Sequence, residues 1–217
     1  MTTNLKAVFF DFGGVVLSSP FEAFNRYEAD NAIPRDFIRR VNSVNPDSNA
    51  WARLERSELS PVDFDEVFAT ESEALGHRIP GSHILALLHG EIRPEMVRAI
   101  DTVKRLGFLT ACLTNNVLSE PKADSSLDDD KRAAIADILT KFDALVESSK
   151  VGVRKPEPRF YEIACETVGV SPTECVFLDD LGINLKPAAA MGMTTIKVTG
   201  ARQALDELGR ILNVTFD

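Results

Sequence analysis

Residues 7–15 read AVFFDFGGV, a short apolar run followed by an aspartate and a glycine-rich turn. A continuous apolar run that ends at turn residues is typical of a strand buried on both faces of a parallel sheet. The same pattern recurs at residues 109–116, LTACLTNN, and at residues 175–180, CVFLDD. The sequence therefore predicts three inner strands, each of which ends in polar residues.

Helical patterns occupy much of the chain between these strands. Residues 94–106 begin with proline, carry apolar residues at helical spacing and precede a glycine, and residues 158–168 repeat this pattern. Such a proline and such a glycine are the expected boundaries of a helix. Weaker strand candidates lie at residues 144–146 and 194–198. Alternating strands and helices predict an α/β fold with a doubly wound, Rossmann-like parallel sheet.

Residues 18–92 break this alternation and contain no convincing strand. Short helices are expected there, near residues 21–30, 34–41, 50–56, 61–75 and 82–88. A helical block between the first strand and the next strand–helix unit is best explained as an inserted domain. The predicted organisation is a core of residues 1–17 and 93–217 with a helical cap of residues 18–92.

The overall composition is that of an ordinary globular protein, with 217 residues, 44% of them hydrophobic and 26% charged. The net charge of −9 argues against a general nucleic-acid binder, which needs a basic face to neutralise phosphates. We see no apolar stretch near the roughly 18 residues of a membrane span and no signal-peptide pattern. We therefore expect a cytoplasmic protein with no membrane partner. Its oligomeric state is not predicted.

The polar residues at the ends of the three inner strands include Asp11, Thr114 and the pair Asp179 and Asp180. In an open parallel sheet, ligands bind beyond the carboxyl ends of the strands, near a topological switch point. If the three strands are neighbours, their carboxylates repel one another unless a cation joins them. Mg²⁺ binds through one or two carboxylates, waters and substrate phosphate. Lys155, in a proline-rich turn before a helix, can hold its ammonium near an anion.

Other polar groups have simpler explanations. The acidic run at residues 128–130, within a predicted exposed loop of residues 122–131, is more typical of a solvated helix start than of a metal site. The histidines of the cap are expected on the surface, at His77, His83 and His89. The three cysteines are too scattered for a disulfide framework or a zinc cluster.

With these residues in place, the sequence resembles the haloacid dehalogenase-like hydrolase superfamily. Four family motifs are matched in order, by residues 10–15 (FDFGGV), Thr114, Lys155 and the acidic pair at residues 179–180, with Asn184 following. The segments SKVGVRKPEP and DDLGINLKPA are further similar to the N-terminal phosphatase domain of soluble epoxide hydrolase and its bacterial relatives. We see no α/β-hydrolase domain in the sequence, so the resemblance does not imply epoxide hydrolysis.

The resemblance implies a Mg²⁺-dependent phosphatase that acts on a small phosphorylated substrate. Asp11 would be the nucleophile, forming an aspartyl-phosphate, and also a metal ligand, together with the backbone carbonyl of Gly13. Thr114 and the backbone near Asn115 would hold the phosphoryl oxygens. Lys155 would balance the charge as the intermediate forms.

The fourth motif supplies the rest of the expected site. Either Asp179 or Asp180 would complete the metal shell, and the sequence leaves open which is the main ligand. Asn184 would orient the lysine or the acidic loop.

Gly13 departs from the family, whose phosphatases usually carry an acid–base aspartate there. General acid–base help is typically worth about 10²–10⁴-fold. Its absence favours a slow phosphatase, good leaving groups, or a substitute acid from the cap. It also admits a metal-independent 2-haloacid dehalogenase, because halide leaves without a proton, or a catalytically silent phosphate-binding module. The sequence leaves open whether Gly13 uses backbone angles that penalise a side chain.

Overall fold

The central strand of the fold is β1, which lies in a five-stranded parallel sheet of order β3-β2-β1-β4-β5. The computed structural model describes residues 5–88, 90–115 and 129–216. The strands are β1 (Ala7–Phe10), β2 (Leu109–Thr114), β3 (Ala144–Glu147), β4 (Cys175–Asp179) and β5 (Thr194–Lys197). The strand order reverses between β1 and β4, which makes this the switch point where ligands bind in such sheets.

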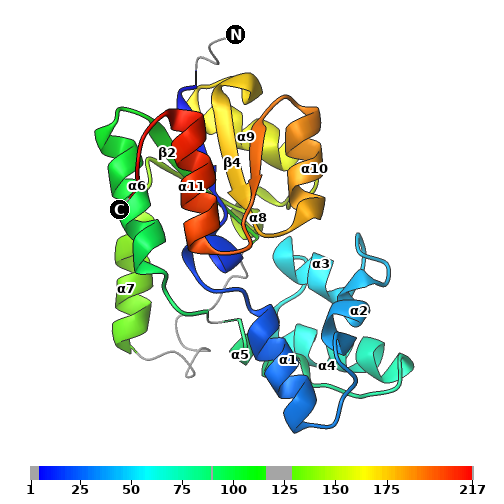
Figure 1. Ribbon diagram of the computed structural model, residues 1–217. Coiled ribbons are helices and arrows are strands. Elements are labelled where there is room, and N and C mark those ends of the chain that lie inside the picture. The colour runs from blue at the N-terminus through cyan, green and yellow to red at the C-terminus, as the bar shows by residue number, and fades with distance from the viewer. Residues whose placement is uncertain (1–4, 89, 116–128, 217) are drawn as a thin grey trace.

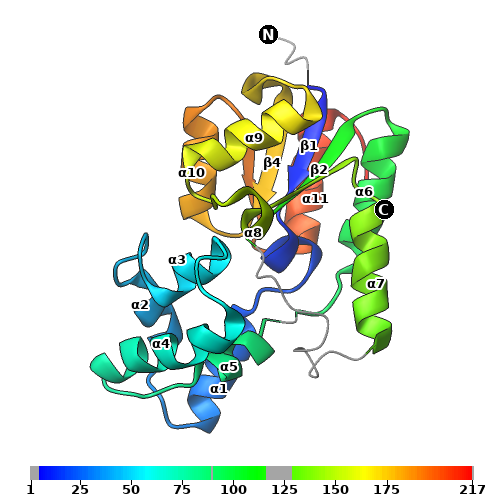
Figure 2. The same cartoon turned by 180° about the vertical axis from the view of Figure 1, so that it is seen from behind.

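Helices cover both faces of the sheet, as Figures 1 and 2 show from opposite sides. Alternate residues of β1 point to opposite faces. Val8 and Phe10 belong to the apolar cluster under the helices α6 (Pro94–Arg105), α7 (Asp129–Thr140) and α11 (Ala201–Leu212). Ala7 and Phe9 belong to the cluster under α9 (Pro158–Val168) and α10 (Gly182–Ala190). Because every residue of β1 is buried, its sequence is apolar without alternation.

Five further helices form a separate body beyond the carboxyl ends of the strands (Figure 1). They are α1 (Phe21–Asp30), α2 (Phe37–Ser43), α3 (Ala50–Glu55), α4 (Pro61–Ala74) and α5 (Gly81–Ala86). They enclose an apolar cluster of their own, which includes Phe37, Phe64 and Phe68. Trp51 packs against the ring of Phe64 at 5.9 Å between centroids, so it belongs to the core of this cap.

The cap joins the core through two linkers that run side by side. Leu17 and Ile92 form an antiparallel bridge, and the amide of Ser18 donates to the carbonyl of Glu91 at 2.7 Å. We propose that the boundary between core and cap lies at this bridge. Three shorter helical turns also occur among the described residues, η1 (Phe12–Val16), α8 (Ser148–Val151) and η2 (Pro172–Glu174).

The predicted doubly wound parallel sheet with a helical insertion is confirmed, and both weaker strand candidates form β3 and β5. The second cap helix begins at Phe37, three residues after the predicted start at Pro34. The buried carboxylate of Glu28 accepts hydrogen bonds from the amides of Asp36 and Ile38, and so satisfies donors at the start of α2. This contact comes from another helix, so local sequence could not indicate it.

The remaining predictions concern the cap histidines, the acidic loop, the cysteines and membrane spans. His77 and His83 lie beside the aromatic rings of Phe37 and Tyr27 in the cap. Residues 122–128 of the predicted acidic loop, and His89, lie outside the described residues. The three cysteines are buried free thiols. Within the described parts of the chain, no helix has the length and hydrophobicity needed to cross a bilayer.

Candidate active site

The carboxyl ends of β1, β2 and β4 bring the predicted site residues together. Parallel registers pair Phe10 with Cys112 on one side and with Leu178 on the other, so the three strands end almost level. Asp11 therefore lies beside Asp179, and its amide donates to the carbonyl of Leu178 at 2.8 Å. One oxygen from each of Asp11, Asp179 and Asp180 lies within 4.8 Å of the others.

Lys155 reaches into this cluster from the loop before α9. Its Nζ lies 2.7 Å from Oδ1 of Asp11 and 2.8 Å from Oδ2 of Asp179, and the residue is 1% exposed. Burial alone would lower the pKa of Lys155, but the two carboxylates outweigh burial and raise that pKa above its ordinary value. The ammonium is therefore charged, and it neutralises one of the three carboxylates.

Asp11 presents one oxygen that is already held and one that receives no hydrogen bond from the described residues. Oδ1 accepts from Lys155 and from the amide of Phe12 at 2.7 Å. No residue in the described parts of the chain donates a hydrogen bond to Oδ2. Burial raises the pKa of Asp11 well above its ordinary value, Lys155 opposes this shift, and the neighbouring carboxylates add to it. A cation bound at this cluster would reduce the repulsion among its carboxylates.

The acidic pair divides into one saturated carboxylate and one available carboxylate. Asp179 is fully buried and accepts from Lys155, from Nδ2 of Asn184 at 3.0 and 3.1 Å, and from the amide of Leu181 at 2.8 Å. Asp180 is partly exposed and accepts from Oγ of Ser19 at 3.1 Å. Asp180 therefore has more free lone pairs for a cation than Asp179 has.

The donor set fits a hard divalent cation. Three carboxylates and one ammonium leave a formal charge of about −2 in one small region. Desolvation and the charge of Asp179 raise the pKa of Asp180. Clustered carboxylate oxygens that raise one another's pKa are stabilised by a bound metal, and oxygen ligands of this kind suit Mg²⁺.

Gly13 and Gly14 have different requirements, although they are neighbours. Gly13 has φ −71° and ψ 132°, angles open to any residue, and an added Cβ would meet nothing within 4 Å. Gly14 has φ +78°, and its Cβ would lie 2.2 Å from Oδ2 of Asp180. The structural need for glycine therefore falls on Gly14, and the missing aspartate at Gly13 has no conformational cause.

Thr114 and Asn115 follow one another at the end of β2. Thr114 is half-buried at the strand tip. The side chain of Asn115 makes two hydrogen bonds with the backbone of Lys155: Oδ1 accepts from its amide and Nδ2 donates to its carbonyl, both at 2.9 Å. The sequence predicts a phosphoryl-binding role only for the backbone near Asn115. Its side chain fixes the main chain of the lysine.

Several contributing residues were missed by sequence reasoning. Tyr161 donates to the carbonyl of Asn184 at 2.6 Å, and Arg93 donates to the carbonyl of Gly14 at 2.8 Å. These contacts hold the fourth motif and the turn after β1. They join residues distant in the sequence, so no spacing pattern signals them. Two more such residues, Glu55 and Arg154, lie between cap and core.

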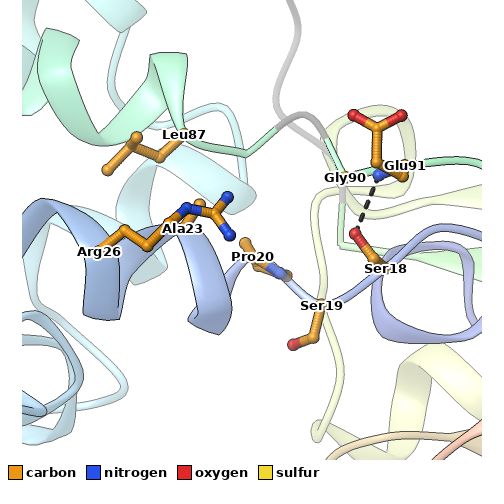
Figure 3. Close-up of a pocket in the computed structure, with 8 residues that line it drawn as sticks. All are labelled: Ser18, Ser19, Pro20, Ala23, Arg26, Leu87, Gly90 and Glu91. Carbon is orange, nitrogen blue, oxygen red and sulfur yellow. Dashed lines mark hydrogen bonds between the residues drawn. The ribbon is translucent and has the colours of Figure 1, made fainter.

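A small pocket of about 100 Å³ lies between the two linkers (Figure 3). Ser18 and Glu91 close one side, where the amide of Glu91 donates to Oγ of Ser18 at 2.9 Å. Ser19, which also lines the pocket, is the residue that donates to Asp180. The pocket therefore adjoins the acidic cluster but is separate from Asp11.

Comparison with known proteins identifies the protein family to which this chain belongs. The family model described as haloacid dehalogenase-like hydrolase matches residues 5–192. The chain is 34% identical over 227 residues to mouse bifunctional epoxide hydrolase 2, across 98% of this chain and 40% of that protein. It is 33% identical over 225 residues to a phosphatase of Mycobacterium tuberculosis, across 97% and 94%.

The chain spans two fifths or less of the length of the mammalian relatives it matches. Among solved structures, a Bacteroides thetaiotaomicron enzyme of this family, in complex with magnesium and inorganic phosphate, matches with a TM-score of 0.60 at 18% identity. That match covers 94% of this chain and 98% of the other. A dehalogenase also matches over both whole chains, with a TM-score of 0.64 at 17% identity. At such identities the likeness shows the fold alone. The chain belongs to the haloacid dehalogenase-like hydrolase family.

Proposed function

We propose that this hydrolase is a Mg²⁺-dependent phosphatase that cleaves small phosphate monoesters through an aspartyl-phosphate on Asp11. The observation that carries the proposal is the cluster of three carboxylates and one ammonium, in which Oδ2 of Asp11 receives no hydrogen bond from the described residues. A phosphatase relative that is 33% identical over nearly its whole length supports this choice of substrate class.

Asp11 begins the reaction by attacking phosphorus through Oδ2. Its other oxygen is fixed by Lys155 and by the amide of Phe12, so the free oxygen points in a defined direction. The new bond joins Oδ2 to phosphorus while the bond from phosphorus to the leaving oxygen breaks. Attack by a carboxylate splits one difficult hydrolysis into two easier steps, the second being hydrolysis of the aspartyl-phosphate by water.

The residues around Asp11 stabilise charge on the transferring group. Mg²⁺, held by Asp11, the carbonyl of Gly13 and Asp180, would withdraw negative charge from the phosphoryl oxygens. Lys155 supplies a positive charge next to Oδ1 of Asp11. Thr114 offers a hydroxyl, and the backbone at Asn115 an amide, to the remaining phosphoryl oxygens.

Asp179 and Asn184 act on the lysine rather than on the substrate. Asp179 accepts from Lys155, and Asn184 donates to both oxygens of Asp179. This arrangement keeps the ammonium directed at Asp11 between turnovers. In this account Asp180 is the main metal ligand of the acidic pair.

The absence of an acid at Gly13 favours a second candidate, a metal-independent 2-haloacid dehalogenase. A halide leaves as an anion and needs no proton, so that chemistry does not miss the aspartate. The available carboxylate of Asp180 argues against this candidate, because a metal-free reaction has no use for it. A catalytically silent phosphate-binding module would keep the same groups without turnover.

A substrate panel separates the three candidates. Phosphate monoesters are assayed with Mg²⁺ and with excess chelator, and 2-haloacids are assayed for halide release without metal. Phosphate release that requires Mg²⁺ supports the proposal. Halide release without metal would support the dehalogenase, and phosphate binding with neither activity would support the binding module.

A further inference from the structure

Glu55, the last residue of α3, is a cap residue whose side chain is buried against the core. Its side chain is 7% exposed, and its partner Arg154 on the core loop is 11% exposed. Nη1 of Arg154 lies 2.5 Å from Oε2 of Glu55, and Nδ2 of Asn115 lies 3.4 Å from the same oxygen. A buried carboxylate is costly unless it is paired. Glu55 is therefore stable in this position only while the cap sits on the core.

Two of the partners of Glu55, Arg154 and Asn115, are connected directly to Lys155. Arg154 precedes Lys155 in the chain and also donates to the carbonyl of Pro46 in the cap. Asn115 holds the amide and the carbonyl of Lys155 through its side chain. The carboxylate of Glu55 thus contacts two of the groups that fix the backbone from which the ammonium reaches Asp11.

The charge of Glu55 is balanced within this contact. Burial raises the pKa of Glu55, while Arg154, a hydrogen bond with Trp51 and, more weakly, the charge of Lys155 oppose that shift. Without the carboxylate, the largely buried guanidinium of Arg154 would keep, among the described residues, only its contact with the carbonyl of Pro46 in the cap. An uncompensated buried charge moves toward solvent when the chain allows it. Such a movement of Arg154 would displace Lys155, its direct neighbour.

Two other polar contacts between this cap segment and described residues of the core are more exposed. Ser57 donates to the carbonyl of Ser149 at 3.2 Å, and both residues lie near the surface. Arg56 lies 3.7 Å from Glu157, whose side chain is 39% exposed. Glu58 is 51% exposed and pairs with Arg56 of its own segment. Glu58 is therefore a matched control: an acidic residue on the same segment, without contact to Lys155 or Asn115.

We propose that Glu55 is a positioning residue, through which docking of the cap fixes Lys155 against Asp11. The proposal rests on the proposed phosphatase function for its effect on rate. Its effect on the lysine loop is independent of the reaction. The residue acts on the geometry of the lysine, so its loss should slow all phosphate esters by the same factor.

The test compares Glu55→Gln with Glu58→Gln. We expect Glu55→Gln to lower kcat about 10²-fold, the usual effect of a misplacement of about 1 Å, with KM nearly unchanged. The factor should be equal for an aryl and an alkyl phosphate. Glu58→Gln should keep the kcat of the native protein. Combined with Asn115→Ala, Glu55→Gln should add little further loss, because coupled residues are not additive.

A second measurement does not depend on turnover. Lys155 is shielded in the native protein, so an amine-acylating reagent followed by peptide mass spectrometry should label it slowly. In Glu55→Gln its labelling should rise severalfold, and in Glu58→Gln it should not. If the native protein cleaves no phosphate ester, the proposed function fails, and this labelling alone decides the role of Glu55.

Three results would overturn the proposal. Native kcat and native labelling in Glu55→Gln would show that the contact has no effect on Lys155. A loss confined to alkyl phosphates would make Glu55 a proton donor instead. Additive losses in the double variant with Asn115 would show that the two residues act separately.

Discussion

Gly13→Asp places a carboxyl group two residues after Asp11, the proposed nucleophile, where the chain has none. The backbone there has φ −71° and ψ 132°, and no atom lies within 4 Å of the added Cβ. Replacing glycine at a compatible position stabilises a protein by about 0.4–1 kcal/mol, because it reduces the conformational entropy of the unfolded chain. Repulsion from the nearby carboxylates opposes this gain. With Mg²⁺ present, we expect the free energy of unfolding to stay within about 1 kcal/mol of the native value.

The effect on rate should depend on the leaving group. A poor leaving group needs a proton as its bond to phosphorus breaks, and general acid catalysis is worth about 10²–10⁴-fold. We therefore expect Gly13→Asp to raise kcat/KM for an alkyl phosphate, such as glycerol 2-phosphate, by about 10²-fold or more. The rate for 4-nitrophenyl phosphate, whose leaving group is stable without a proton, should change little.

The assay measures initial phosphate release from both esters with the native protein, Gly13→Asp and Gly13→Asn. The asparagine variant is the control, because it has the same size but cannot act as an acid. Equal native rates on both esters would mean that another group already supplies the proton. Equal alkyl-phosphate rates for the aspartate and asparagine variants would show that the added carboxyl group does not act as an acid, and would also refute the missing-acid account.

Three further predictions concern neighbouring residues. Gly14→Ala should lower the free energy of unfolding by about 2 kcal/mol or more, because φ is +78° and the added Cβ would overlap Asp180. Gly13→Ala should lower it by less than about 1 kcal/mol. Similar denaturation midpoints for the two variants would contradict this prediction. Mg²⁺ at about 100 times its Kd should raise Tm by about 5–10 °C. Asp180→Asn should abolish this shift, and Asp179→Asn should only reduce it. If Asp179→Asn instead abolished the shift and Asp180→Asn only reduced it, Asp179 would be the main metal ligand. Without Mg²⁺, Lys155→Met should cost about 3–5 kcal/mol in urea denaturation, because two buried carboxylates lose their partner, and a loss below 1 kcal/mol would contradict the buried ion pair.

The strand ends could be predicted because their signal is local. A short apolar run that ends at turn residues, such as residues 7–10, is typical of an inner strand, and a parallel sheet places the residues after such strands at one edge. Asp11, Thr114 and Asp179 follow from that rule alone. The position of Lys155 followed from its proline-rich turn and from the family resemblance.

The features that could not be predicted depend on contacts between distant segments. The difference between Asp179 and Asp180 arises from Asn184, Leu181 and Ser19, which no spacing pattern connects. The ordinary backbone of Gly13 is visible only in three dimensions. The pairing of Glu55 with Arg154 depends on where the cap lies on the core, and the spacing of apolar residues in the sequence does not indicate that position.

The central claim is that Asp11 becomes phosphorylated during turnover, and trapping that intermediate tests it most directly. The native protein is mixed with 4-nitrophenyl phosphate and Mg²⁺, quenched in acid within the first turnover, and examined by peptide mass spectrometry. The account predicts one added phosphoryl group on Asp11 of the native protein, and none in Asp11→Asn or in the presence of excess chelator. Undiminished phosphate release by rigorously purified Asp11→Asn, with no phosphorylated peptide in the native protein, would contradict it.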